Sequence, residues 1–413
     1  MNYKQIILNK LLDKYEKSRS YLENTNRRIM IKAQEIKEYN VENYEQKILF
    51  HEILKELKAK RIVDFNYLKY EEGNILDKIW LEKENVDNAY IEIQRENPKI
   101  MYVLILKQLK NIKFEQEWLQ RFCKNITTYM IENQKENSLL PLSKSEFILK
   151  ALEDIDKMQS ISKVNSVLKR IFSIKCYNDS KYFERYIEKN IISIVKKYYF
   201  EKDDNVELNN DEILKEIGIV KYPEVIEFCG NMKCKIKENL IEFSDITMGN
   251  YINSHTILNI EDIELIDVDK IIWIENKANY IDYISNKKTN EFVVYHGGFY
   301  SPIKGEFFKK VYEASKRTSK DITYLHWSDI DIGGFEIFTR LQSNIVKEIQ
   351  PYKMDKNTLV KNKNHWNYFD ENYRKKLCKL RQSDKYNIFF EIIDIMLEYN
   401  CKLEQEALIS GMN

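Results

Sequence analysis

The chain has 413 residues, 43% hydrophobic and 32% charged, which is typical of a globular protein of two or three domains and not of a disordered chain. Its 66 Lys and Arg nearly balance its 65 Asp and Glu, so any DNA-binding surface must be local and not a property of the whole chain. No apolar run approaches the ~18 residues of a membrane span, and no secretory apolar block follows the first methionine. We therefore expect a cytoplasmic protein that makes no membrane contact, with its six cysteines reduced because no pair has Cys-x-x-Cys spacing.

The first 95 residues predict a winged-helix domain. The expected elements are a helix at 4–19, a strand at 28–32, a helix at 42–58, and strands at 61–69 and 75–81 joined by a turn at 71–74. Residues 1–40 hold nine Lys or Arg against five Asp or Glu, which is compatible with DNA contact. Winged helices also dock on other proteins, so the sequence leaves both roles open.

Two regions link this domain to the C-terminal third. Residues 96–160 predict a helical arm with helices at 99–136 and 143–158, the second opened by the capping box Ser143-Lys144-Ser145-Glu146. Residues 161–262 predict a mixed α/β linker domain. Its expected elements are helices at 161–172 and 182–199, then short strands within 224–243.

The last domain, residues 263–413, predicts an α/β fold with a parallel sheet, which makes the whole chain α+β. Strands are expected at 271–274, 291–295 and 322–327, and helices at 277–285, 304–316 and 335–346. The first strand, Ile271-Ile272-Trp273-Ile274, is an apolar run of the kind found in buried parallel strands.

Three carboxylates follow these strands. Glu275 comes directly after the first, and Asp329 and Asp331 come after the third. Ligands of open parallel sheets bind at the carboxyl ends of the strands, and two acids at i and i+2 in an extended segment point to the same side. Mg²⁺ or Mn²⁺ prefers such oxygen ligands, and Gly333 and Gly334 leave room for a phosphate backbone. The alternative is a solvated loop in which Asp331 caps the next helix.

These residues carry a resemblance. Glu275 and the Asp329-x-Asp331 pair, spaced by alternating strands and helices, resemble the Toprim fold of topoisomerases, primases and several nucleases. More closely, the chain is similar to JetD, the nuclease subunit of Wadjet anti-plasmid systems. The matching segments are Asn178–Lys181, Ile274–Asn276, His326–Phe335 and Leu403–Glu406, although Ser328 stands where the family commonly has Gly.

The resemblance implies a Mg²⁺- or Mn²⁺-dependent endonuclease that cuts double-stranded DNA in anti-plasmid defence. It also implies a homodimer that works with an SMC-like and kleisin ATPase complex. Glu275, Asp329 and Asp331 would then be catalytic and would bind the metal, and Glu404 and Glu406 would complete the metal site. From the residues alone, Glu404 and Glu406 lie two apart on an expected helix and fit a solvated helix end equally well.

Other candidates have simpler interpretations. Asp179 and its neighbours fit a helix cap, although Lys181 contacting a phosphate is the alternative. His296 and His326 flank the expected site and fit packed, hydrogen-bonded side chains, so we leave them out of it. Two other functions stay open: a tyrosine transesterase like topoisomerase VI, and a non-catalytic DNA-binding subunit.

Overall fold

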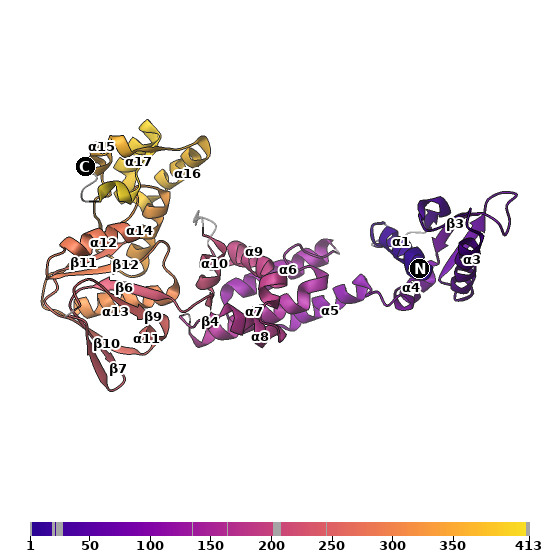
Figure 1. Cartoon of the computed structure of the whole chain (residues 1–413), viewed down its shortest axis with the longest axis horizontal. Helices are drawn as coiled ribbons and strands as arrows, with labels where there is room; N and C mark the ends of the chain where they lie inside the picture. Colours follow the sequence, from indigo (N-terminus) through magenta and orange to yellow (C-terminus); the bar gives the residue numbers. More distant parts are fainter. Residues whose placement is uncertain are drawn as a thin grey trace. The chain divides into compact units, whose positions relative to one another are not determined.

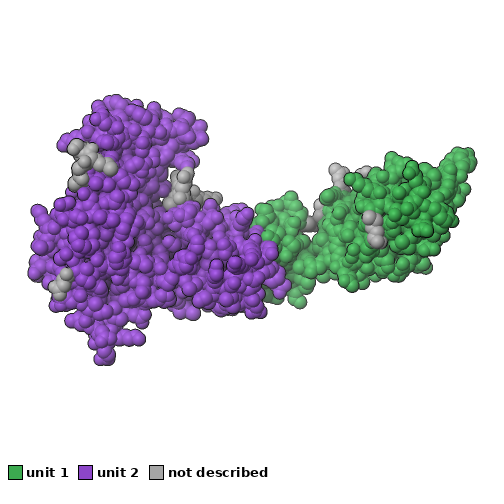
Figure 2. Space-filling model, in the orientation of Figure 1, with its two compact units in different colours: residues 1–112, 123–145 green, residues 113–122, 146–413 purple. Residues whose placement is uncertain are grey.

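The structure is a computed structural model that describes residues 2–18, 21, 28–133, 135–162, 164–200, 208–244 and 246–409. The chain folds as a mixed α/β protein in two compact units, residues 1–112 with 123–145 and residues 113–122 with 146–413 (Figure 2). The finer division into four domains stays a prediction. Among the described residues, no helix has the length and apolar character that crossing a membrane requires.

The first unit begins with the predicted order of helix, strand, helix and hairpin (Figure 1). Its elements are α1 (Tyr3–Glu16), β1 (Ile29–Lys32), η1 (Ala33–Glu35), α3 (Tyr44–Ala59), β2 (Val63–Tyr67), β3 (Leu76–Leu81), η2 (Lys83–Asn85), α4 (Val86–Glu92), α5 (Pro98–Asn111) and η3 (Leu142–Lys144). β3 pairs antiparallel with both β1 and β2. α1, α3 and α4 bury their apolar faces against this sheet in one core.

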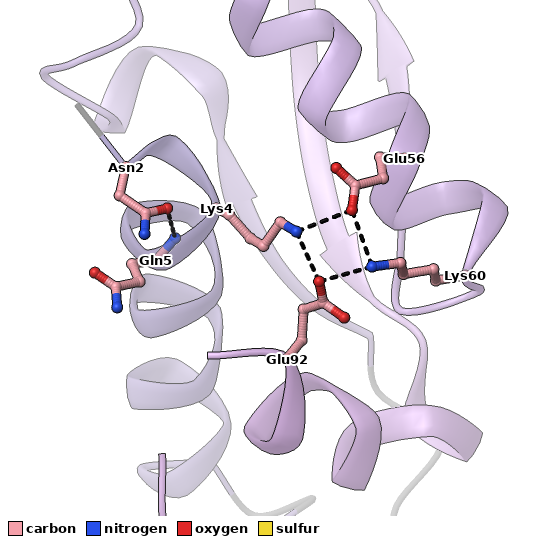
Figure 3. Close-up of polar contacts among 6 residues, drawn as sticks. All are labelled: Asn2, Lys4, Gln5, Glu56, Lys60 and Glu92. Carbon is pink, nitrogen blue, oxygen red and sulfur yellow. Dashed lines mark hydrogen bonds and ion pairs between the residues drawn. The ribbon is translucent and has the colours of Figure 1, made fainter. Parts of the chain in front are cut away.

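A polar network also joins the three helices of this core. Lys4 of α1 lies 2.9 Å from Glu56 of α3 and 2.7 Å from Glu92 of α4, and Lys60 lies 2.9 and 2.8 Å from the same two carboxylates (Figure 3). Hydrogen bonds from Lys4 and Lys60 lower the pKa of Glu56 to about 2. The two ammonium groups therefore favour the charged form of both acids.

A helical region opens the second unit. Its elements are α6 (Glu117–Asn133), which runs on into the first unit, α7 (Ser145–Ile161), β4 (Val167–Leu168), α8 (Lys169–Tyr177), the π-helical turn η4 (Phe183–Ile187), α9 (Glu188–Tyr198), α10 (Asn210–Glu216) and β5 (Ile219–Val220). The expected helix over 161–172 is wrong up to Leu168, and a helix, α8, begins only at Lys169. Val167 and Leu168 instead pair with Ile219 and Val220, because the backbone of Gly218 turns with a positive φ and accepts the Val167 N–H.

The larger sheet of the second unit confirms the predicted parallel strands. The remaining elements are β6 (Val225–Cys229), β7 (Met232–Ile236), β8 (Asn239–Glu242), β9 (Asn250–Asn253), α11 (Ser254–Leu258), β10 (Ile260–Leu265), β11 (Lys270–Ile274), α12 (Lys277–Asn286), β12 (Glu291–Tyr295), α13 (Pro302–Lys316), β13 (Thr323–Trp327), α14 (Ile332–Asn344), β14 (Gln350–Pro351), α15 (Lys356–Lys361), η5 (Lys363–His365), β15 (Asn367–Tyr368), α16 (Glu371–Arg381), η6 (Asp384–Phe389), α17 (Phe390–Tyr399), β16 (Cys401–Lys402) and η7 (Gln405–Leu408). The strand order within the described residues is β14-β13-β11-β12-β6-β9, and β11 runs parallel to both β12 and β13.

The central strand β11 is covered on both faces. Ile271 and Trp273 join the core that contains α13 and α14, whereas Ile272 and Ile274 pack with α12. α12 and α13 accordingly lie on opposite sides of the sheet (Figure 1). All four side chains have no exposed surface, as the apolar run predicts. Glu275 directly follows the carboxyl end of this buried central strand.

Candidate metal centre

Two neighbouring strand ends form the base of the site. β11 ends at Ile274 beside Trp327, the last residue of β13, and the Glu275 N–H donates to the Trp327 carbonyl at 2.9 Å. The chain then leaves β11 through Asn276, whose side chain accepts the N–H groups of Ala278 and Asn279 and caps α12. Glu275 is thereby fixed next to the loop that carries Asp329 and Asp331.

The loop after β13 turns sharply into α14. Asp331 is the N-cap of that helix, and its Oδ1 accepts the Gly334 N–H at 2.8 Å. The capping role offered as the simpler alternative is therefore present. It uses one oxygen, and Oδ2 points to the Lys402 ammonium, 3.8 Å away. A Cβ on Gly334 would lie 2.1 Å from the Asp329 carbonyl, so the close packing of the loop itself requires this glycine.

A C-terminal segment crosses this loop and brings further acids. Ile330 and Leu403 exchange backbone hydrogen bonds of 2.9 and 3.2 Å, which places Glu404 beside Asp329. Glu404 is extended and η7 starts only at Gln405, so the expectation that Glu404 and Glu406 share a helix is wrong. The two carboxylates therefore turn toward one point. Ligand oxygens of Asp329, Glu404 and Glu406 all lie within 4.8 Å of one another.

Gln405 holds the C-terminal segment in place. It is a buried polar residue, with only 1% of its surface exposed. Its N–H donates to Asp329 Oδ1 at 2.6 Å, and its Oε1 accepts the Asn276 N–H at 3.0 Å. The Asn279 side chain donates to the Gln405 carbonyl at 2.7 Å, and the Asn276 amide donates to Glu406 Oε1 at 2.6 Å. One residue thus connects the end of β11, the start of α12 and the loop after β13.

Burial and mutual repulsion disfavour the ionised form of most of these acids. Burial, followed by the charges of Asp329 and Asp331, raises the pKa of Glu275 to about 8. Burial and then Asp331 raise the pKa of Asp329 to about 7, and burial also raises the pKa of Asp331. Burial raises the pKa of Glu404 too, but the hydrogen bond and charge of Lys402 and the hydrogen bonds with Asp329 and Asn367 together outweigh it, so the net pKa is lowered. The protein alone therefore does not stabilise all of these carboxylates in their ionised form.

The residues present fit a hard divalent cation. The donors are carboxylate oxygens, the ligands that Mg²⁺ and Mn²⁺ prefer. Glu275 Oε2 is buried and finds no hydrogen-bond partner among the described residues. A cation would give this oxygen a partner and would favour the ionised form of the neighbouring acids. Glu275 and Asp331 also line a pocket of about 320 Å³, together with Gly333, Tyr373 and Lys376.

The two flanking histidines are packed side chains, as the simpler interpretation has it. His296 and His326 are 1% and 0% exposed, and their rings stack at 5.0 Å. His296 bonds to the Gly298 carbonyl and His326 to the Ser328 hydroxyl. Burial lowers the pKa of His296 to about 3 and also lowers that of His326, so both rings stay neutral near pH 7.

The cap expected at Asp179 is wrong, because η4 has Tyr182 as its N-cap and no side-chain capping bond, and Asp179 only closes the turn before it. Its Oδ1 accepts the Lys181 N–H at 2.7 Å in the turn that precedes η4. Three other residues around the acids were not found from the sequence. Gln405 and Asn276 lie inside the motifs but gave no sign of their mutual contacts, and Tyr373, whose hydroxyl accepts the Ile332 N–H at 2.9 Å, has no motif around it. Only tertiary contacts reveal these roles.

Comparison with known proteins finds relatives of this chain. Residues 241–412 match the family model described as the C-terminal region of the Wadjet protein JetD. A protein of Bacillus cereus (strain Q1) named Wadjet protein JetD is 28% identical over 425 aligned positions, which cover the whole of both chains. The candidate acids that follow β11 and β13, together with Glu404 and Glu406, all lie inside the matched C-terminal region. Both comparisons show that the chain is similar to the Wadjet protein JetD, through its C-terminal region and along its full length.

Proposed function

We propose that this chain is a metal-dependent endonuclease that hydrolyses double-stranded DNA in anti-plasmid defence. The observation that carries the proposal is that ligand oxygens of Asp329, Glu404 and Glu406 lie within 4.8 Å of one another at the carboxyl edge of a parallel sheet. Glu275 and Asp331 lie outside this group of three, but the charges of Asp329 and Asp331 reach Glu275 and raise its pKa. This arrangement is the one expected of a Toprim domain, which we assign to residues 263–413. By its order of elements we assign residues 1–95 to a winged helix.

The acids of the site and the residues beside them have separate roles in this proposal. Glu275, Asp329, Glu404 and Glu406 would hold Mg²⁺ or Mn²⁺, and Asp331 would supply Oδ2 while its other oxygen fixes the start of α14. The bound ion would orient water and neutralise the charge that develops on the phosphodiester. Gln405 and Asn276 keep the two groups of acids in register. The pocket beside Glu275 and Asp331 gives the DNA backbone access to the acids.

Hydrolysis is favoured over a covalent tyrosine mechanism. Tyr373 is the tyrosine that lines the pocket with Glu275 and Asp331. Its hydroxyl already accepts the Ile332 N–H, and burial and then Asp331 raise its pKa. A nucleophilic tyrosine needs the opposite shift or an adjacent base. Tyr373→Phe should therefore cut DNA normally, and no protein–DNA adduct should survive denaturation.

The direct test is plasmid cutting by the full chain together with the products of its neighbouring genes. Glu275→Gln and Asp329→Asn should abolish Mg²⁺- or Mn²⁺-dependent cutting and should also lose Mn²⁺ binding. Asp321→Asn is a matched control, because Asp321 is an exposed acid before the start of β13. Cutting by Glu275→Gln or Asp329→Asn at the rate of the unaltered protein would remove these acids from the reaction. A lack of both Mn²⁺ binding and cutting by the unaltered protein, even with the products of its neighbouring genes, would favour the non-catalytic, DNA-binding role.

The N-terminal unit fits protein docking better than DNA reading. The outward face of α3 and the turn before it expose Val41, Tyr44, Ile48 and Leu49 by 39, 68, 38 and 47%. Glu45 and Glu52 are exposed on the same face of α3, which carries one exposed base, Lys55. DNA phosphates require Lys and Arg at this position, whereas apolar side chains flanked by acids suit a protein groove with a basic rim. We assign this surface to the SMC-like partner complex.

A further inference from the structure

One cation already lies among the acids assigned to the metal. Lys402 is the last residue of β16, which pairs with β15 through Asn367. Its Nζ is 2.7 Å from Glu404 Oε1 and 3.8 Å from Asp331 Oδ2. The side chain is only 26% exposed, so solvent screens this charge incompletely. Lys402 therefore bridges an acid of the C-terminal segment and an acid of the loop after β13.

The contact with Glu404 conflicts with metal binding. Glu404 belongs to the group whose ligand oxygens lie within 4.8 Å of one another, together with Asp329 and Glu406. Its Oε1 accepts from Lys402 and also, at 3.4 Å, from the side-chain amide of Asn367. An oxygen engaged in this way is a weaker metal ligand, and a neighbouring ammonium repels a divalent cation. Both effects act in the same direction.

We propose that Lys402 is a resident counter-ion that competes with the divalent cation for Glu404 and thereby sets the metal affinity of the site. The inference rests on the proposed function, because it takes Glu404 to be a metal ligand. The proposed role of Lys402 predicts an effect on metal affinity that the acids alone do not predict. Removing a positive charge from the site should strengthen metal binding, whereas a lysine that merely positioned Glu404 would weaken it when removed.

The test measures Mn²⁺ binding to the full chain by electron paramagnetic resonance, without DNA. Lys402→Met keeps the length of the side chain and removes its charge. Because a partly exposed ion pair stabilises by up to ~1 kcal/mol, the Kd for Mn²⁺ should fall about fivefold. Lys402→Arg keeps the charge and should stay near the unaltered value. Lys356→Met is the matched control, because Lys356 pairs with Glu391 on the surface of the same unit.

A double-substitution cycle shows whether the effect acts through Glu404. In a Glu404→Gln background the tightening caused by Lys402→Met should shrink, since the shorter of its two ion pairs is then absent. Thermal unfolding confirms that each variant is folded, and Lys402→Gln replaces Lys402→Met if the latter is not. An unchanged or weaker Mn²⁺ affinity in the folded variant overturns the proposal.

The outcomes separate this inference from the proposed function. If the unaltered chain binds Mn²⁺ and Asp329→Asn abolishes binding, but Lys402→Met has no effect, only the role of Lys402 fails. If the unaltered chain binds no Mn²⁺, the metal site and the counter-ion fail together. If binding persists in Asp329→Asn, the ion lies elsewhere and both are again overturned.

Discussion

Replacing Gln405 by Met should weaken both the fold and metal binding. Methionine keeps the volume and the unbranched shape, so the change deletes the two hydrogen bonds of the amide. The Trp327 carbonyl loses one donor but still accepts the Glu275 N–H, whereas the half-buried Asn276 N–H loses the hydrogen bond that it donates to Gln405 Oε1. Such an orphaned donor costs about 1–2 kcal/mol.

The same cost should appear in metal affinity, because the segment that carries Glu404 and Glu406 loses the bonds of the Gln405 side chain to Asn276 and Trp327, although the Gln405 backbone keeps its bonds, such as the one from Asn279. A loss of about 1.4 kcal/mol corresponds to a tenfold higher Kd for Mn²⁺. Mn²⁺ binding is measured by electron paramagnetic resonance and stability by thermal unfolding of the same samples. Gln382→Met, at an exposed position after α16, is the control. A Kd that stays constant while stability falls would refute the positioning role.

Three further predictions concern other parts of the chain. Gly334→Ala should destabilise the second unit by about 1–3 kcal/mol in thermal unfolding, because its Cβ would lie 2.1 Å from the Asp329 carbonyl. Gly333→Ala should cost less, because its Cβ would lie 3.3 Å from Asp331 Oδ1, and equal effects would contradict this. Ile48→Glu with Leu49→Glu should abolish co-purification with the SMC-like complex and leave Mn²⁺ binding unchanged, so retained co-purification would remove the α3 surface from docking. Glu56→Gln should lower hydrogen-exchange protection of α1 and α3 by less than about 1 kcal/mol at pH 7, since the acid is largely exposed.

The pH dependence of the last effect follows from the lowered pKa of Glu56, about 2 in the fold against 4.5 ordinarily. A carboxylate whose pKa is depressed by folding stabilises the protein fully above its ordinary pKa. That contribution is lost as the pH falls from about 4.5 toward 2. The difference between the unaltered chain and Glu56→Gln should therefore vanish over this window, and a difference that persists at pH 2 would exclude the network of Figure 3 as its source.

Local sequence patterns predicted the central strands of the large sheet in the second unit and their parallel pairing. The apolar run before Glu275 indicated a strand buried on both faces, and the structure confirms it. Alternating strands and helices predicted parallel pairing, which places the carboxyl ends of β11 and β13 at one edge. Glu275, Asp329 and Asp331 were therefore predictable as neighbours, because backbone periodicity and crossover handedness are properties of short stretches of chain.

Only the tertiary structure decided how the site is completed. The bonds from Gln405 to Asn276 and Asp329 join residues far apart in sequence, and such contacts leave no periodic signal. For the same reason Glu404 and Glu406 were expected on a helix, whereas pairing of Leu403 with Ile330 extends the chain there. The sequence thus specified the strands that present the acids. Long-range hydrogen bonds and burial determined which acids meet, which is why the position of Lys402 among them became visible only in the folded chain.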